Sequence, residues 1–186
     1  MNDAELLARA RNGDAEAFGD LVDRHRGAVH RAALAALGGG TEADDVAQEA
    51  FLLAHRRLAT FRGESSFRTW LVRIAWRRAL NRRRVAWLRR FVSADALRET
   101  GWEPADPGNS AEAGLLDREL LEQVRRLISA LPSGLRDPLL LQATGDHTVE
   151  EIGVTLGIPA GTVKYRVFEA RRRLRERLSR LGYADE

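Results

Sequence analysis

The sequence of 186 residues contains no cysteine, and this absence excludes several kinds of chemistry. Without thiols the chain forms no disulfide, has no thiolate nucleophile and offers no cysteine ligand to zinc. It has only four histidines, His25, His30, His55 and His147, which are scattered, and the five-residue spacing of the first two is not a metal-ligand spacing on one helix face. We therefore expect no metal site, no cofactor and a reducing compartment.

Long apolar runs are also missing, and lysine is almost absent. No stretch approaches the roughly 18 apolar residues that are needed to cross a bilayer, and the polar start MNDAELLARARNGD does not have the pattern of a secretion signal. Lys164 is the single lysine, so arginine carries nearly all of the positive charge. We expect no membrane insertion and a cytoplasmic location.

Charge is distributed unevenly along the chain, although the net charge is only +3. Residues 1–90 contain 17 arginines against 11 acidic residues, whereas residues 91–114 contain one arginine against five acidic residues. Nine arginines and no carboxylate lie between Arg68 and Arg90, and residues 161–180 hold eight basic residues against two glutamates. Basic clusters of this density attract polyanions in a salt-dependent way, so nucleic acid is the expected partner.

The periodicity of apolar residues is helical throughout and predicts an all-α fold with two small domains. We expect an N-terminal helical bundle over residues 1–91 and a C-terminal four-helix domain with a helix-turn-helix over residues 114–186. Residues 92–113 are acidic, contain two prolines and are predicted to form a flexible linker between the domains. Whether the two domains pack together stays open, because a linker of this composition permits both arrangements.

Caps and apolar stripes place the individual helices. Asp14, Thr41 and Ser66 are the predicted N-caps of the first three. The predicted helices cover residues 15–37, 42–59, 67–88, 114–130, 134–143, 149–156 and 160–180.

Residues 148–178 fit a helix-turn-helix. Thr148 and Glu151 have the spacing of a capping box, Gly157 is expected to end the first helix and Pro159 to start the second. Gly153 stands where two steeply crossing helices leave little room for a side chain. One stripe of the second helix is apolar, through Val163, Val167, Ala170, Leu174 and Leu178, and the opposite face carries Gly161, Tyr165, Phe168 and Arg172. The alternative is a plain helical hairpin with a solvated basic tail.

The helix predicted after Ser66 places its tryptophans on different faces. Trp70 lies in an apolar stripe with Phe67, Leu71 and Ile74 and is expected in the core. Trp76 lies on the other side, next to Thr69, Arg73, Leu80 and Arg83, and is predicted to face outward. An aromatic ring among guanidinium groups suits stacking on unpaired bases. The alternative is that another helix or the linker covers Trp76.

Three blocks then occur in order: DDVAQEAFLLAHRRL at 44–58, FRGESSFRTWLVRIA at 61–75 and LPSGLRDPLLLQATGDHTVEEIGVTLGIPAGTVKYRVFEARRRL at 131–174. Together they closely resemble the extracytoplasmic-function group of sigma-70-type bacterial RNA polymerase sigma factors. The resemblance covers about residues 14–180 and implies an alternative sigma factor that binds core polymerase and directs promoter recognition and transcription initiation. It implies no catalytic residue, so we expect no enzyme.

The resemblance assigns the helix over residues 42–59 to docking on the clamp helices of the polymerase beta-prime subunit, with the beta flap as a further polymerase contact. The docking residues are Asp45, Gln48, Glu49, Phe51 and Leu52. Asp45 and Glu49 lie one turn apart and can face arginines together, while the two apolar residues supply contact area. The alternative for the carboxylates is a magnesium site for phosphoryl chemistry, which would make the chain a metal-dependent nucleic-acid enzyme.

The same resemblance places recognition of the promoter minus-ten element, including a flipped base, on the loop at 61–66 and on the helix after it. The assigned residues are Phe61, Arg62, Gly63, Ser65, Ser66, Arg73, Trp76, Arg77, Leu80 and Arg83. The helix after Pro159 would recognise the minus-thirty-five element in the major groove. Its assigned residues are Thr162, Lys164, Tyr165, Arg166, Phe168, Glu169, Arg171 and Arg172.

Departures from the family pattern concern the promoter sequence. Arg77 stands where the family usually has asparagine, and Tyr165 replaces a small polar residue. Glu169 could accept from a cytosine amine or pair with Arg166 or Arg173 along the helix; we favour the ion pair.

The resemblance also implies an anti-sigma factor as regulator, a nucleoid-associated place in the bacterial cytoplasm, and a linker that threads toward the polymerase active-site cleft and RNA exit channel. A merely solvated linker is the alternative for that segment. The alternative function for the whole chain is a stand-alone helix-turn-helix transcriptional regulator.

Overall fold

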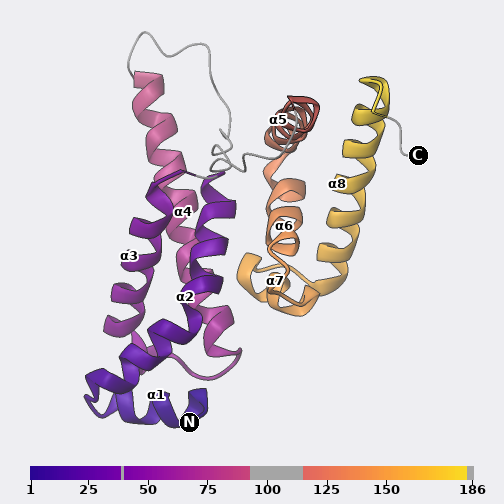
Figure 1. Cartoon of the computed structure of the whole chain (residues 1–186). Helices are drawn as coiled ribbons and strands as arrows, with labels where there is room; N and C mark the ends of the chain where they lie inside the picture. Colours follow the sequence, from indigo (N-terminus) through magenta and orange to yellow (C-terminus); the bar gives the residue numbers. More distant parts are fainter. Residues whose placement is uncertain (39, 93–114, 184–186) are drawn as a thin grey trace.

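A computed structural model describes residues 1–38, 40–92 and 115–183 of the chain (Figure 1). Within these ranges the backbone forms eight α-helices and one short 3₁₀ turn, with no strand. The all-α prediction is confirmed. Val92, the first residue of the predicted linker, is the last residue of a helix. The rest of the predicted linker, residues 93–113, lies outside the described residues.

The N-terminal half is a bundle of three long helices with a short one across its end (Figure 1). The helices are α1 (Asp3–Arg11), α2 (Ala15–Leu37), α3 (Glu42–Arg56) and α4 (Phe67–Val92), with the 3₁₀ turn Leu58–Thr60 after α3. One cluster of buried side chains holds α1 to α4 together and includes Leu6, Leu21, Phe51 and Leu71. Trp70 packs partly buried against this cluster, as its place in the apolar stripe predicts.

Side-chain caps explain where most of these helices begin. Asp14 accepts from the backbone N–H of Ala17 at 3.0 Å, and Ser66 accepts from that of Thr69 at 3.1 Å, so both predicted caps are confirmed. The predicted cap at Thr41 is wrong, because its backbone is already helical and its side chain makes no capping bond within the described chain. Helix α1 was not predicted; it begins with a reciprocal capping box between Asn2 and Glu5.

The C-terminal half contains α5 (Leu115–Ser129), α6 (Ser133–Ala143), α7 (Val149–Leu156) and α8 (Ala160–Arg180), within one residue of the predicted bounds. Thr148 and Glu151 form the predicted capping box at the start of α7. Gly157 ends that helix at φ 70°, a left-handed conformation that glycine adopts without strain. A Cβ on Gly153 would lie 2.7 Å from the carbonyl oxygen of Ile158, which confirms the expected close approach.

The two halves pack against each other, a point that the sequence alone left open. α7 lies against α4, and α6 lies against α2 (Figure 1). One cluster of buried side chains runs through both halves and includes Ala32, Val72 and Trp76 from the first half with Leu141 and Ile152 from the second. The C-terminal half therefore covers part of the surface of α2 and α4.

Candidate functional site

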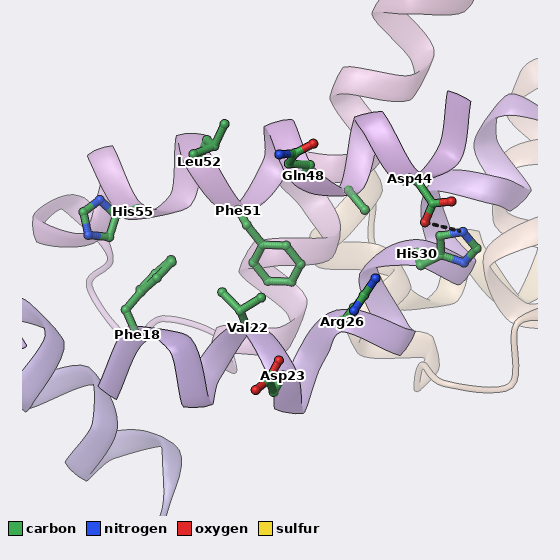
Figure 2. Close-up of a pocket in the computed structure, with 11 residues that line it drawn as sticks. Phe18, Val22, Asp23, Arg26, His30, Asp44, Gln48, Phe51, Leu52 and His55 are labelled. Atoms are coloured by element: carbon green, nitrogen blue, oxygen red, sulfur yellow. Dashed lines mark ion pairs between the residues drawn. The ribbon is translucent and has the colours of Figure 1, made fainter. Parts of the chain in front are cut away.

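A groove of about 580 Å³ lies between α2 and α3 (Figure 2). Its lining combines aromatic and aliphatic side chains with a few charged ones. The lining residues are Phe18, Val22, Asp23, Arg26, His30, Asp44, Ala47, Gln48, Phe51, Leu52 and His55. An apolar groove with a charged rim is suited to a protein partner.

The predicted docking residues lie on α3 at this groove or beside it. The ring of Phe51 points from α3 toward Val22 of α2 and is only 8% exposed, whereas Leu52 is 55% exposed (Figure 2). Gln48 also lines the groove and is exposed to solvent. Phe51 thus forms the floor, and Leu52 offers apolar area to a partner.

Interactions between α2 and α3 define the two ends of the groove. The rings of Phe18 and His55 meet edge to face with centroids 4.7 Å apart at one end. The Nε2 atom of His30 lies 3.4 Å from a carboxylate oxygen of Asp44 at the other end (Figure 2). These two contacts join α2 and α3 at opposite ends of the groove.

Asp45 and Glu49 lie one turn apart on α3, as predicted, but an arginine of the same chain already faces them. Arg82 of α4 donates to Glu49 at 2.5 Å and lies 3.7 Å from Asp45. Hydrogen bonding to Glu49 is the main cause that raises the pKa of the Arg82 guanidinium. Among the described residues no group of three or more acidic or histidine side chains is placed to hold a metal ion. Any further cation that approached these carboxylates would therefore share them with Arg82.

Trp76 does not face outward, and that prediction is wrong. Its side chain is only 1% exposed, and its neighbour Thr69 on the same face of α4 is fully buried. The C-terminal half covers this face, because α7 packs against α4 and Trp76 belongs to the buried cluster that both halves share. A helical wheel gives the direction of a side chain relative to its own helix but says nothing of a second domain that packs there.

The other predicted residues on this face of α4 differ in exposure. Arg77 is exposed, whereas Arg73, Leu80 and Arg83 are half-buried. Arg83 donates to the backbone carbonyl of Ala36 at 3.0 Å, and burial is the main cause that lowers its pKa. Arg77 is thus accessible to a partner, whereas Arg73 and Arg83 are partly covered.

The loop at 61–66 separates into a buried and an exposed part. The ring of Phe61 is 8% exposed and packs against Phe67 and Trp70 with centroids 5.4 and 5.2 Å away, so this side chain belongs to the core. Arg62 and Gly63 are exposed, and Gly63 has φ 77°, which favours glycine. Ser66 is exposed but its hydroxyl caps α4.

The outer face of α8 is open to solvent, as the helix-turn-helix pattern predicts. Tyr165 is 64% exposed and Phe168 66% exposed, and Lys164 and Arg171 are exposed beside them. Thr162 and Arg166 are half-buried. This helix face thus combines two exposed aromatic rings with basic side chains, a composition suited to apolar and phosphate contacts with nucleic acid.

Glu169 lies among these basic side chains of α8 and binds two of its arginines. Its carboxylate accepts from Arg172 at 2.9 Å and from Arg173 at 2.7 Å, and these hydrogen bonds, that of Arg172 first, lower the pKa of Glu169 to about 2. Arg172 also donates to Glu176 at 2.6 Å. The interpretation of Glu169 as an ion-pair partner is confirmed for Arg173, and the structure adds Arg172.

Sequence reasoning missed the polar contacts between the two halves. Arg31 of α2 forms a bidentate ion pair with Asp146 at 2.6 and 2.8 Å. Glu151 of α7 accepts from Thr69 of α4 at 3.0 Å and from Arg68 at 3.2 Å. These partners lie more than 80 positions apart in the chain, so no local pattern could have paired them.

Comparisons with known proteins agree with the three sequence blocks. The family model described as Sigma-70 region 2 matches residues 21–89, and the model described as Sigma-70, region 4 matches residues 121–174. The first match covers α3 and most of the groove and of α4, and the second covers α6, α7 and most of α8.

Full-length relatives show the same relationship. The ECF RNA polymerase sigma-E factor of Escherichia coli K12 is 37% identical over 92% of this chain and 91% of its own length. The solved structure of CnrH in complex with the cytosolic domain of CnrY is similar with a TM-score of 0.67 and 28% identity, over 95% of this chain and 97% of that one. The sigma factor RpoE from Bartonella quintana, solved with the anti-sigma factor NepR, shares the fold with a TM-score of 0.67 over 87% of this chain and 96% of that one, at 20% identity. This chain therefore belongs to the extracytoplasmic-function group of sigma-70-type RNA polymerase sigma factors.

Proposed function

We propose that this sigma factor binds core RNA polymerase through the groove between α2 and α3 and recognises promoters through α4 and α8. Residues 1–91 would act as the region 2 domain, residues 114–186 as the region 4 domain and residues 92–113 as the linker. The observation that carries the proposal is the open basic and aromatic face of α8 on a helix-turn-helix, in a chain matched by both sigma-70 models.

For polymerase docking we propose Asp45, Gln48, Glu49, Phe51 and Leu52 as the contact residues. The groove supplies a concave apolar surface with Phe51 at its floor and Leu52 at its edge. The carboxylates beside it carry negative charge that suits arginines of a partner. This combination supports the beta-prime clamp helices as the docked element, with the beta flap as a second contact of the polymerase.

For the minus-ten element we propose the exposed part of the 61–66 loop together with α4. The exposed Arg62 and Gly63 and the half-buried Ser65 would contact the flipped base, and three arginines of α4 would contact the DNA backbone: Arg73, Arg77 and Arg83. Trp76 is covered by the C-terminal half and is left out of this proposal, and Leu80 is half-buried. For the minus-thirty-five element, Tyr165 and Phe168 would contact thymine methyl groups, while Lys164 and Arg171 would bind phosphates.

The further partner would be an anti-sigma factor, since the solved RpoE structure contains one and the CnrH structure contains the cytosolic domain of CnrY. We place the protein in the bacterial cytoplasm at the nucleoid and assign it no catalytic residue and no cofactor. No helix among the described residues combines the length and apolar character required to cross a membrane.

Transcription with purified core polymerase tests the proposal. Adding the full chain to core is expected to produce specific run-off transcripts from promoters of its own genome, whereas the chain alone binds these duplexes weakly. If the chain binds promoter duplexes tightly without polymerase and gives no specific start site, it is a stand-alone regulator and the proposal is wrong.

Replacing Leu52 with alanine is expected to weaken binding to core polymerase about tenfold, which corresponds to about 1.4 kcal/mol. Leu52 is 55% exposed at the groove, so its removal takes apolar area from the interface without opening a cavity in the fold. Titration of labelled chain with core measures the affinity. Leu181→Ala is the matched control, since that leucine is 52% exposed in the C-terminal half. An equal loss in both variants would argue against the groove.

Replacing Arg172 with alanine is expected to cost about 1 to 3 kcal/mol of promoter binding at one base pair of the minus-thirty-five element. Glu169 and Glu176 hold the guanidinium in place, which orients it for one contact. Binding of the holoenzyme to a set of single-base promoter variants measures the preference at each position. Arg171→Ala is the comparison and should weaken all sequences equally, as a phosphate contact does. A uniform loss for Arg172→Ala would assign it to a phosphate instead.

A further inference from the structure

The loop at 61–66, which we propose contacts the flipped base, is fixed at its first residue. The ring of Phe61 is buried, and the backbone N–H of Phe61 donates to the carbonyl of Leu58 at 3.2 Å. The carbonyl of Phe61 accepts from a guanidinium N–H of Arg11. The side chain and both backbone polar groups of Phe61 are therefore held, and together they set the direction in which the chain enters the loop.

Arg11 is the last residue of α1 and lies 50 positions before Phe61 in the chain. Its guanidinium carbon lies 6.0 Å from the centroid of the Phe61 ring, which is the outer limit of a cation–π contact. One guanidinium thus contacts both the ring and the backbone of Phe61. The nearby Arg9 bonds instead to Asp14, the N-cap of α2.

The other end of the loop is connected to α1 through α2. Phe67, the first residue of α4, is 3% exposed, and its ring centroid lies 5.7 Å from that of His25 on α2. The Nε2 atom of His25 lies 2.8 Å from a carboxylate oxygen of Asp3, the first residue of α1. The two ends of α1 are therefore connected to the two phenylalanines that flank the exposed part of the loop.

The segment between these two phenylalanines is largely open to solvent. Arg62, Gly63 and Glu64 are exposed, and Gly63 has φ 77°. A short exposed segment takes its position from the scaffold at its two ends. A change at either end is therefore expected to move the residues that we propose contact the flipped base.

The contacts of α1 with the loop are separate from its contribution to the core. Leu6 and Leu7 belong to the buried cluster that holds α1 to α4 together. Arg11 is exposed, so its guanidinium adds a directional hydrogen bond to this apolar packing. α1 also lies before residue 21, where the match of the Sigma-70 region 2 model begins.

We propose that α1 positions the minus-ten loop, with Arg11 as the positioning residue for recognition of the flipped base. The inference rests on the proposed role of the loop at 61–66. Arg11 acts through Phe61 and not by touching DNA: it fixes the entry to the loop, so that Arg62 and Gly63 are already in one arrangement when the base binds. A loop that is ordered in advance binds more tightly, because less conformational entropy is lost on binding.

Binding of the holoenzyme to single-stranded minus-ten DNA tests this inference. The probe is a dye-labelled non-template-strand oligonucleotide from a promoter that the unaltered holoenzyme transcribes, and fluorescence anisotropy measures its affinity. A second oligonucleotide has an abasic site at the minus-ten position where loss of the base weakens binding most. The variants are Arg11→Ala and Arg11→Lys. Arg9→Ala is the matched control, since it removes the same charge from an exposed position of the same helix.

We expect Arg11→Ala to weaken binding of the intact oligonucleotide about tenfold and to leave binding of the abasic one unchanged, since only the intact strand presents the base to the loop. Arg11→Lys should lose less affinity, because an ammonium group can still donate to the Phe61 carbonyl. Arg9→Ala should bind both oligonucleotides like the unaltered chain. Circular dichroism and the affinity for core polymerase should be the same for all of these chains, which excludes unfolding as the cause.

Two results would overturn the inference. An equal loss of affinity for both oligonucleotides in Arg11→Ala indicates a phosphate contact or a general loss of structure. Unchanged affinity of Arg11→Ala for the intact oligonucleotide shows that Arg11 does not position the loop. In both cases the proposed function stands, provided that the unaltered holoenzyme distinguishes the intact from the abasic strand. If the unaltered holoenzyme transcribes but binds both strands equally, the proposed role of the loop is wrong, and if it transcribes from no promoter, the proposed function is wrong.

Discussion

Replacing Trp76 with alanine is expected to lower the free energy of unfolding by about 3 to 5 kcal/mol. The indole is 1% exposed and lies in the apolar cluster shared by both halves, so its removal leaves a cavity. The loss should also separate the two halves, because the cavity opens at the boundary between α4 and the C-terminal half. Urea unfolding followed by circular dichroism measures the first effect, and small-angle X-ray scattering of the chain measures the second.

Trp76→Phe is the matched control for this experiment. Phenylalanine keeps most of the apolar volume and removes the indole N–H, which has no hydrogen-bond partner among the described residues. We expect Trp76→Phe to lower the free energy of unfolding by about 1 kcal/mol or less. The smaller ring loses apolar contacts, but the change also removes a buried N–H donor that has no partner, and the two effects oppose each other. If Trp76→Ala leaves stability unchanged and only impairs promoter opening, the side chain faces outward and the packing described above does not exist in solution.

Local signals were sufficient for most of the fold. Asp14, Ser66 and Thr148 each cap the helix predicted to follow them, because a side-chain oxygen reaches backbone N–H groups two or three residues away. The apolar stripe through Val163 and Val167 correctly gave the buried side of α8. Such features depend on a few neighbouring residues and can be predicted from sequence.

The environment of Trp76 could not be predicted in the same way. Its direction on α4, opposite Phe67 and Leu71, followed from the helical period, but what lies there depends on α7, more than 70 positions later in the chain. The ion pair between Arg31 and Asp146 has the same character, since its partners lie 115 positions apart. Composition and periodicity indicated two basic helical faces, and only the tertiary structure shows that one of them is partly covered.

Replacing Gly153 with alanine is expected to destabilise the C-terminal half by about 1 to 3 kcal/mol and to weaken minus-thirty-five binding. The added Cβ would lie 2.7 Å from the carbonyl oxygen of Ile158. That atom belongs to the backbone of the turn, so it cannot move aside as a side chain would. The Gly153 carbonyl also accepts from the N–H groups of Gly157 and Ile158, which fixes the turn from both sides. α8 must therefore shift relative to α7 to admit the methyl group.

Gly19→Ala in α2 separates this steric effect from the general effect of alanine in a helix. A Cβ at Gly19 would have no heavy atom within 4 Å among the described residues, and the position is exposed. Because alanine favours the helix over glycine, this change should stabilise the chain by up to about 1 kcal/mol. Chemical unfolding and binding of the holoenzyme to promoters with an altered minus-thirty-five element measure both variants. If Gly153→Ala is as stable as Gly19→Ala and retains its minus-thirty-five preference, the close approach of the turn does not set the position of α8.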